Sequence, residues 1–120
     1  MVLTLLIFSV VQNRFYADTG YDREIRAFCR QHAIVYQSFW TLTANPHLLS
    51  HPTIRSLAAK HDRTPAQVLF RYLTLEGVAP LCGTRSPEHM REALEIFELE
   101  LEESERESLT RLLSRWPRGT

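Results

Sequence analysis

Cysteine is scarce in this sequence, with Cys29 and Cys82 its only two representatives among 120 residues. A pair of cysteines without metal-ligand spacing argues against a disulfide-stapled scaffold and suits a reducing, cytoplasmic compartment. The formal net charge is zero, because 14 basic residues balance 14 acidic ones. The chain therefore lacks the overall field that favours nucleic acid or an anionic membrane as a partner.

Long apolar runs are absent too. The longest opens the chain as MVLTLLIFSVV and is too short to span a bilayer as a helix. A secretion signal is the alternative for this run, but no Lys or Arg precedes it and no A-x-A cleavage pattern follows it. Its β-branched and aromatic residues favour a strand buried on both faces, as in a parallel sheet. With no internal repeat or linker, residues 1–120 are expected to form a single soluble domain.

Capping residues and apolar periodicity predict a series of helices separated by two further strand-like runs, at 33–39 and 78–82. The helix after Asp22 is expected to bury Ile25, Phe28 and Cys29 and to expose Arg26. Glutamates crowd residues 95–107 and are expected to form a solvated helix face. The remaining helices are expected to begin at Pro52, Pro65, Pro87 and Glu102.

The stretch from Val78 to Leu94 combines a short apolar run, a turn and a helix start. Ser86 is a good N-cap and Pro87 suits the first helical position. A loop after a strand that leads into the N–H groups of a helix is a common anion site, and Gly83 allows close backbone approach. Phosphate is the natural ligand, although most such loops bind nothing.

Strands that alternate with helices predict a parallel sheet with right-handed crossovers. Ligands of such folds lie at the carboxyl ends of the strands. Three segments are therefore expected on one rim, namely residues 12–15, 39–42 and 83–86.

The sequence resembles the C-terminal part of the aldo-keto reductases, NAD(P)H-dependent oxidoreductases of aldehydes and ketones. The resemblance runs from about Val10 to about Leu113 and rests on VVQNRFY, FCRQHAIVYQSFWTLT, HPTIRSLAAKHDRTPAQVLFRYL and GVAPLCGTRSPEHMREALEIFELEL. It implies an α/β fold, an incomplete (β/α)8 TIM barrel of three C-terminal βα units and a last helix. A complete barrel needs roughly 250 residues.

The resemblance also implies site residues for NADP(H) or NAD(H). Gln12 matches the glutamine that hydrogen-bonds the nicotinamide carboxamide, and Phe39 takes the place of a tyrosine that stacks on the nicotinamide ring. Trp40 and Leu42 match the loop along the pyrophosphate.

At the adenosine end, Gly83, Thr84 and Arg85 match the loop around the phosphate. Helix positions His89, Glu92 and Ala93 match an arginine and a Glu-Asn pair of the family. Many members carry Lys where Gly83 stands, Arg for His89 and Asn for Ala93. The choice between NADP and NAD stays open, because Arg85 can replace one lost cation.

The family's catalytic Asp, Tyr, Lys and His belong to earlier strands and have no counterpart here, so no catalytic residue is assigned. Nucleotide binding by this chain alone is expected to be weak, with the missing barrel half or self-association as further partners. A non-catalytic nucleotide-binding or scaffold module and a structural remnant are the alternatives to a reductase fragment. No metal site is expected, because His47 and His51 lack the intervening glutamate of zinc peptidases and are favoured as loop histidines.

Overall fold

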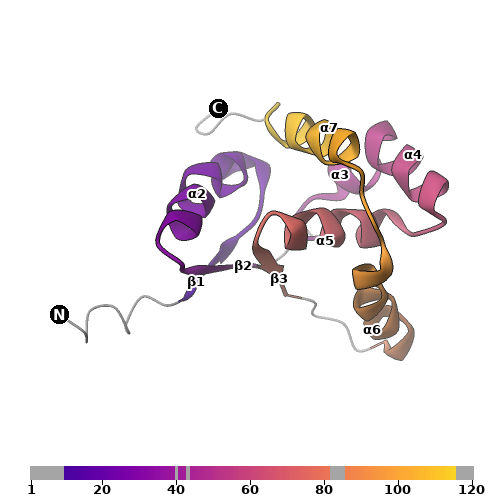
Figure 1. Ribbon diagram of the computed structural model, residues 1–120, viewed down its shortest axis with the longest axis horizontal. Helices are drawn as coiled ribbons and strands as arrows, with labels where there is room; N and C mark the ends of the chain where they lie inside the picture. Colours follow the sequence, from indigo (N-terminus) through magenta and orange to yellow (C-terminus); the bar gives the residue numbers. More distant parts are fainter. Residues whose placement is uncertain (1–9, 40, 43, 82–85, 116–120) are drawn as a thin grey trace.

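The computed structural model describes residues 10–39, 41–42, 44–81 and 86–115. Three strands form one sheet in the order β1 (Val10–Arg14), β2 (Val35–Phe39), β3 (Val78–Pro80). Both neighbouring pairs are parallel, with helical segments in each crossover (Figure 1). The predicted parallel α/β arrangement is therefore present. The expected strand residues before Val10 lie outside the described part of the chain.

Helices account for most of the remaining described chain, and their starts follow the predicted caps. Pro52, Pro65 and Pro87 each occupy the first helical turn, after His51, Thr64 and Ser86 as N-caps. The helical elements are η1 (Ala17–Asp22), α2 (Arg23–Gln31), α3 (Pro46–Leu49), α4 (Pro52–His61), α5 (Pro65–Leu75), α6 (Pro87–Leu94), η2 (Glu95–Glu98) and α7 (Glu103–Leu113).

Helices cover only one face of the sheet. In β2, Tyr36 and Ser38 are buried, whereas Val35 on the other face is 46% exposed. Helices α2 and α5 lie on the same side of the strands (Figure 1). Because no described element covers the opposite face, the prediction of a first strand buried on both faces is wrong for β1, whose Val10 is 48% exposed. We call this side the open face.

The core centres on α5 and α7. The spacing of Val68, Leu69, Tyr72 and Leu73 in the sequence predicts one apolar helix face, and α5 buries all four. On α7 the buried leucines Leu109, Leu112 and Leu113 belong to the same apolar cluster. Both helices also satisfy their first N–H groups through capping boxes, which lowers the cost of burying their ends.

Helix α2 buries a different stripe from the one its apolar residues predicted. Cys29 is buried as expected, but Arg26 is also buried and Phe28 is 54% exposed. Asp22, in a left-handed conformation, accepts hydrogen bonds from Asn13 and Tyr36 at 2.8 and 2.5 Å. The Nε of Arg26 donates to the backbone carbonyl of Tyr21, and this hydrogen bond offsets part of the cost of burying the guanidinium.

Glu105 corrects the expectation that the C-terminal glutamates are all solvated. Glu105 is only 6% exposed, and its carboxylate contacts Lys60 Nζ at 2.9 Å and His61 Nε2 at 3.1 Å. Burial alone would raise the pKa of Glu105, but the backbone N–H of Glu102 and these two side chains lower it to about 2. This carboxylate therefore joins α4 to the start of α7.

The depressed pKa predicts an acid-dependent loss of stability. The carboxylate of Glu105 stabilises the fold above its ordinary pKa near 4.5, and this contribution disappears as the pH falls through about 2. Glu105→Gln is expected to be less stable at neutral pH, by at most about 3 kcal/mol, and to show a flatter stability profile between these pH values. Chemical denaturation followed by circular dichroism at a series of pH values measures this.

The matched control is Glu107→Gln, which changes an exposed glutamate of the same helix. It is expected to follow the wild-type profile, because an exposed carboxylate contributes little to the free energy of unfolding. Parallel acid profiles for Glu105→Gln and the wild type would contradict the prediction.

Candidate functional site

The carboxyl ends of the three strands lie on one rim, as predicted. Arg14 pairs in register with Phe39, and Ser38 pairs with Pro80. The pairing continues past the strand ends, since Phe15 N donates to Phe39 O at 3.1 Å and Leu81 N donates to Ser38 O at 2.9 Å. The segments that leave the strands therefore start side by side.

Gln12 and Phe39 share the open face next to this rim. Gln12 lies opposite Gln37 in the register, and Phe39 follows Gln37 by two residues, so all three side chains lie on the same face. Gln12 is exposed and Phe39 is half-buried. The open face thus presents an amide, which can donate and accept hydrogen bonds, beside an aromatic ring.

The loop after β2 is anchored by contacts of its side chains with the protein interior. Thr41 is buried and its hydroxyl lies 2.8 Å from that of Ser38. Leu42 is half-buried and packs against the core cluster. Trp40, the other site residue expected in this loop, lies outside the described residues.

Asn45 is a rim residue that the site prediction missed. Its Nδ2 donates to Phe15 O at 2.6 Å and to Thr41 O at 2.9 Å, so that one side chain joins the loops after β1 and β2. The only sequence signal was the Asn-Pro dipeptide, which indicated where a helix could not continue. Such a signal does not identify the carbonyl groups that the amide contacts.

A second contact joins η1 and α3, the helical segments that follow the same two strands. Tyr21 Oη lies 2.7 Å from His47 Nε2, and the Tyr21 side chain is fully buried. Burial raises the pKa of Tyr21, while burial and the neighbouring His51 lower the pKa of His47. Both groups are therefore neutral near pH 7. Among the described residues, no three His, Cys, Asp or Glu side chains are grouped to hold a metal ion.

Helix α6 begins as the sequence predicted, with the Ser86 hydroxyl accepting from His89 N at 3.3 Å. Gln67 of α5 contacts this helix, since its Nε2 donates to Glu92 O at 2.9 Å. On this helix the side chain of His89 is exposed, and Glu92 and Ala93 are half-buried. The other expected residues of this end, Gly83, Thr84 and Arg85, lie outside the described part of the chain.

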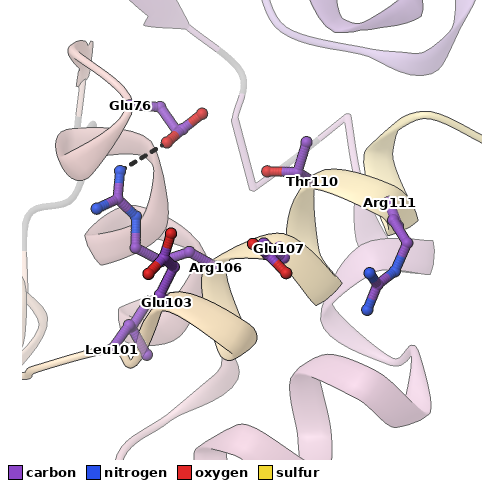
Figure 2. Close-up of a pocket in the computed structure, with 7 residues that line it drawn as sticks. All are labelled: Glu76, Leu101, Glu103, Arg106, Glu107, Thr110 and Arg111. Atoms are coloured by element: carbon purple, nitrogen blue, oxygen red, sulfur yellow. Dashed lines mark hydrogen bonds and ion pairs between the residues drawn. The ribbon is translucent and has the colours of Figure 1, made fainter.

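A pocket of about 540 Å³ lies elsewhere on the molecule (Figure 2). An ion pair at 2.9 Å between Arg106 and Glu76 crosses it. Glu76 precedes β3 by two residues, which places this pocket near the amino end of the strand and away from the rim. Its lining contains none of the predicted site residues and consists of Glu76, Leu101, Glu103, Arg106, Glu107, Thr110 and Arg111.

The helices of the described residues are all too short or too polar to traverse a lipid bilayer.

Comparisons with known proteins agree with this geometry. The sequence model of the aldo/keto reductase family matches residues 7–114. An NADH-dependent D-xylose reductase of Candida parapsilosis is 39% identical over 67 residues, which cover 56% of this chain and 21% of that protein. An aldo-keto reductase of Mycolicibacterium vanbaalenii is 37% identical over 78 residues, covering 65% of this chain and 28% of that protein.

Solved structures show the same fold. An aldo-keto reductase from a Medee basin deep-sea metagenome library superposes with a TM-score of 0.75 at 21% identity, covering 92% of this chain and 40% of the other. A mutant of Gox0644 in complex with NADPH gives a TM-score of 0.73 at 28% identity, over 91% of this chain and 38% of that one. The chain therefore spans less than half the length of these proteins, and its three parallel strands correspond to part of a barrel.

Proposed function

Since this chain belongs to the aldo/keto reductase family, we propose that it is the cofactor-binding C-terminal part of an NAD(P)H-dependent reductase of aldehydes or ketones. The observation that carries the proposal is that Gln12 and Phe39 lie on the same open face, beside a common rim of strand ends. Their chemistry fits a nicotinamide, whose carboxamide both donates and accepts hydrogen bonds and whose ring is flat.

At the nicotinamide end, the Gln12 amide would hydrogen-bond the carboxamide and the Phe39 ring would stack on the nicotinamide. Trp40 and Leu42 would lie along the pyrophosphate. When bound, the nicotinamide supplies the hydride that reduces a carbonyl. The part of this chain would be to orient the nicotinamide ring. Phe39 would do so by stacking alone, because it lacks the hydroxyl that a tyrosine would offer at the same place.

At the adenosine end, the Gly83–Arg85 loop and the start of α6 would hold the phosphate. Ser86 already occupies the N–H of His89, so the loop and the Arg85 guanidinium would provide most of the attraction. Gly83 and His89 stand where many members of the family carry cations, and Ala93 stands where many carry an asparagine. We therefore propose that either NADP(H) or NAD(H) is accepted, with Arg85 and Glu92 as the polar contacts.

The relatives support a nicotinamide nucleotide of either kind. The Candida parapsilosis protein is described as NADH-dependent, and a probable D-xylose reductase of Aspergillus flavus, 42% identical over 67 residues, as NAD(P)H-dependent. The catalytic Asp, Tyr, Lys and His that the family carries on earlier strands have no counterpart in residues 1–120. Reduction would therefore require those strands in addition to this part.

Nucleotide binding by residues 1–120 is expected to be weak and to depend on Arg85. Loss of one charge-assisted hydrogen bond costs roughly 1.5–3 kcal/mol, so Arg85→Ala should weaken the binding of NADPH by about 10- to 100-fold. Calorimetric or ligand-observed NMR titrations with NADPH and with adenosine 2′,5′-bisphosphate measure this. Arg91→Ala is the control, because Arg91 is an exposed cation in the last turn of α6.

Two results would contradict the proposal. One is the absence of detectable binding of both nucleotides to the wild-type chain. The other is equal affinity of the Arg85→Ala and Arg91→Ala variants, which would exclude the assigned phosphate loop.

A further inference from the structure

Asn45 is a fully buried polar side chain at the rim, with no exposed surface. It comes just before α3, four residues beyond Thr41, whose carbonyl it contacts. Its second acceptor, Phe15 O, lies thirty residues earlier in the chain. Within the described part of the chain its Oδ1 has no hydrogen-bond partner, so the side chain is oriented by its two donated bonds.

These hydrogen bonds belong to a set of contacts that connects the carboxyl ends of β1 and β2. Phe15 N donates to Phe39 O at 3.1 Å, and Phe15 O accepts from Asn45 at 2.6 Å. The same Asn45 amide reaches Thr41 O at 2.9 Å. The carbonyl of Phe39 and the loop after it are thus tied to the backbone that leaves β1, the strand of Gln12.

We propose that Asn45 is the positioning residue that holds the nicotinamide-binding groups of β1 and β2 in one arrangement. The inference rests on the proposed function and extends it to a residue that touches no cofactor. Two fully buried hydrogen bonds to carbonyl groups fix the relative position of the two loops. The ring of Phe39 and the amide of Gln12 are then presented together, before any ligand binds, which lowers the entropic cost of binding.

Gln67 provides a matched comparison at the other end of the site. It is a buried amide too, and its Nε2 donates to Glu92 O at 2.9 Å and so ties α6 to α5. Its Oε1 accepts from Thr64 N at 2.9 Å within the capping box. Asn45 and Gln67 therefore hold different ends of the proposed nucleotide site through the same chemical group.

The test replaces each amide by the carboxylate of the same shape. Asn45→Asp removes both donors to the rim carbonyls, whereas Gln67→Glu removes the donor to Glu92 O and keeps the acceptor for Thr64 N. NADPH and adenosine 2′,5′-bisphosphate are titrated against the wild type and both variants. The emission spectrum of NADPH is recorded in parallel, because it reports the surroundings of the nicotinamide.

For the wild type, NADPH is expected to bind about tenfold more tightly than the bisphosphate, as one aromatic contact and one hydrogen bond would provide. Asn45→Asp is expected to abolish this difference and the shift in NADPH emission, while the affinity for the bisphosphate stays unchanged. Gln67→Glu is expected to weaken both nucleotides alike.

Circular dichroism checks that each variant is folded. If Asn45→Asp does not fold, Asn45→Ser, which keeps one short donor, takes its place and should lower the difference in affinity. Three results would overturn the inference and leave the phosphate site in place. The first is an unchanged preference for NADPH in the Asn45 variants, and the second is that these variants bind NADPH and the bisphosphate more weakly by the same factor. The third is equal affinity of the wild type for NADPH and the bisphosphate. If the wild type binds neither nucleotide, the proposed function fails and the inference fails with it.

Discussion

Residues 1–120 alone are expected to reduce no carbonyl compound with NADPH. Hydride transfer to a carbonyl needs an acid that protonates the developing alkoxide and lies within hydrogen-bond reach of it. The resemblance to the aldo-keto reductases implies that this acid is a tyrosine whose pKa a lysine lowers, and it assigns neither role to a residue of this chain. Losing the acid alone costs about 10²- to 10⁴-fold in rate, and losing the positioning by the other strands adds to it.

Tyr16 and Lys60 are the side chains that could substitute for this tyrosine and lysine, but they do not form such a pair. Tyr16 is half-buried and follows β1 at the rim, where the Arg14 guanidinium lies 5.1 Å from its ring centre. Lys60, the single lysine, is on α4 and contacts Glu105 on α7 at 2.9 Å. Because that contact holds the ammonium group in the helical layer, Lys60 does not form the tyrosine–lysine pair with Tyr16 at the rim.

NADPH oxidation with 4-nitrobenzaldehyde and 9,10-phenanthrenequinone measures the activity. The expected result is no turnover above the rate without protein. The Tyr16→Phe variant serves as the matched control, since it removes only the hydroxyl. Turnover that survives rigorous purification and disappears in Tyr16→Phe would show that the chain has its own acid and would overturn the prediction.

Self-association of residues 1–120 is the second large effect that we expect. Among the described residues the sheet has two open edges, at β1 and β3, and strands with unpaired N–H and C=O groups readily pair with other chains. Large apolar side chains are exposed in addition, on the open face, on α2 and along α6 and η2. They are Val10, Phe28, Val35, Leu81, Met90, Leu94 and Phe97, with exposed fractions between 41% and 72%.

The stripe along α6 and η2 differs from the sequence prediction. The spacing of Met90, Ala93, Leu94 and Phe97 predicts one apolar side of a single helix, but Phe97 lies in η2, Ala93 is half-buried and the other three are exposed. An amphipathic stripe indicates that a helix packs against something, but not that the partner is within the same 120 residues. The stripe is therefore available to another chain.

Sedimentation velocity tests the association directly. The wild type is expected to sediment as a mixture of oligomers, and Leu94→Glu, which charges the most exposed of these side chains, is expected to reduce but not abolish it. Ser56→Glu on α4 is the control, because it adds the same charge at an exposed position without removing apolar surface. A sharp monomer peak with a cooperative thermal transition for the wild type would contradict the prediction.

Local signals in the sequence determined where the helices begin and which face of α5 is buried. A cap followed by proline acts within one turn, so Thr64-Pro65 and Ser86-Pro87 had their predicted effect whatever surrounds them. The common rim was predictable for a similar reason, since parallel strands joined by helices all end on one side. The prediction for Trp40 rests on the resemblance alone, and that for the Gly83–Arg85 loop rests on the strand–loop–helix pattern together with the resemblance.

Contacts between distant segments decided the rest. Arg26 is buried because it reaches a backbone carbonyl of a left-handed turn, and Glu105 is buried because Lys60 and His61 meet it from another helix. Asn45 links loops thirty residues apart, which no local pattern encodes. The free energy of burying a polar group depends on whether a partner is present, and the sequence specifies that partner only through the fold.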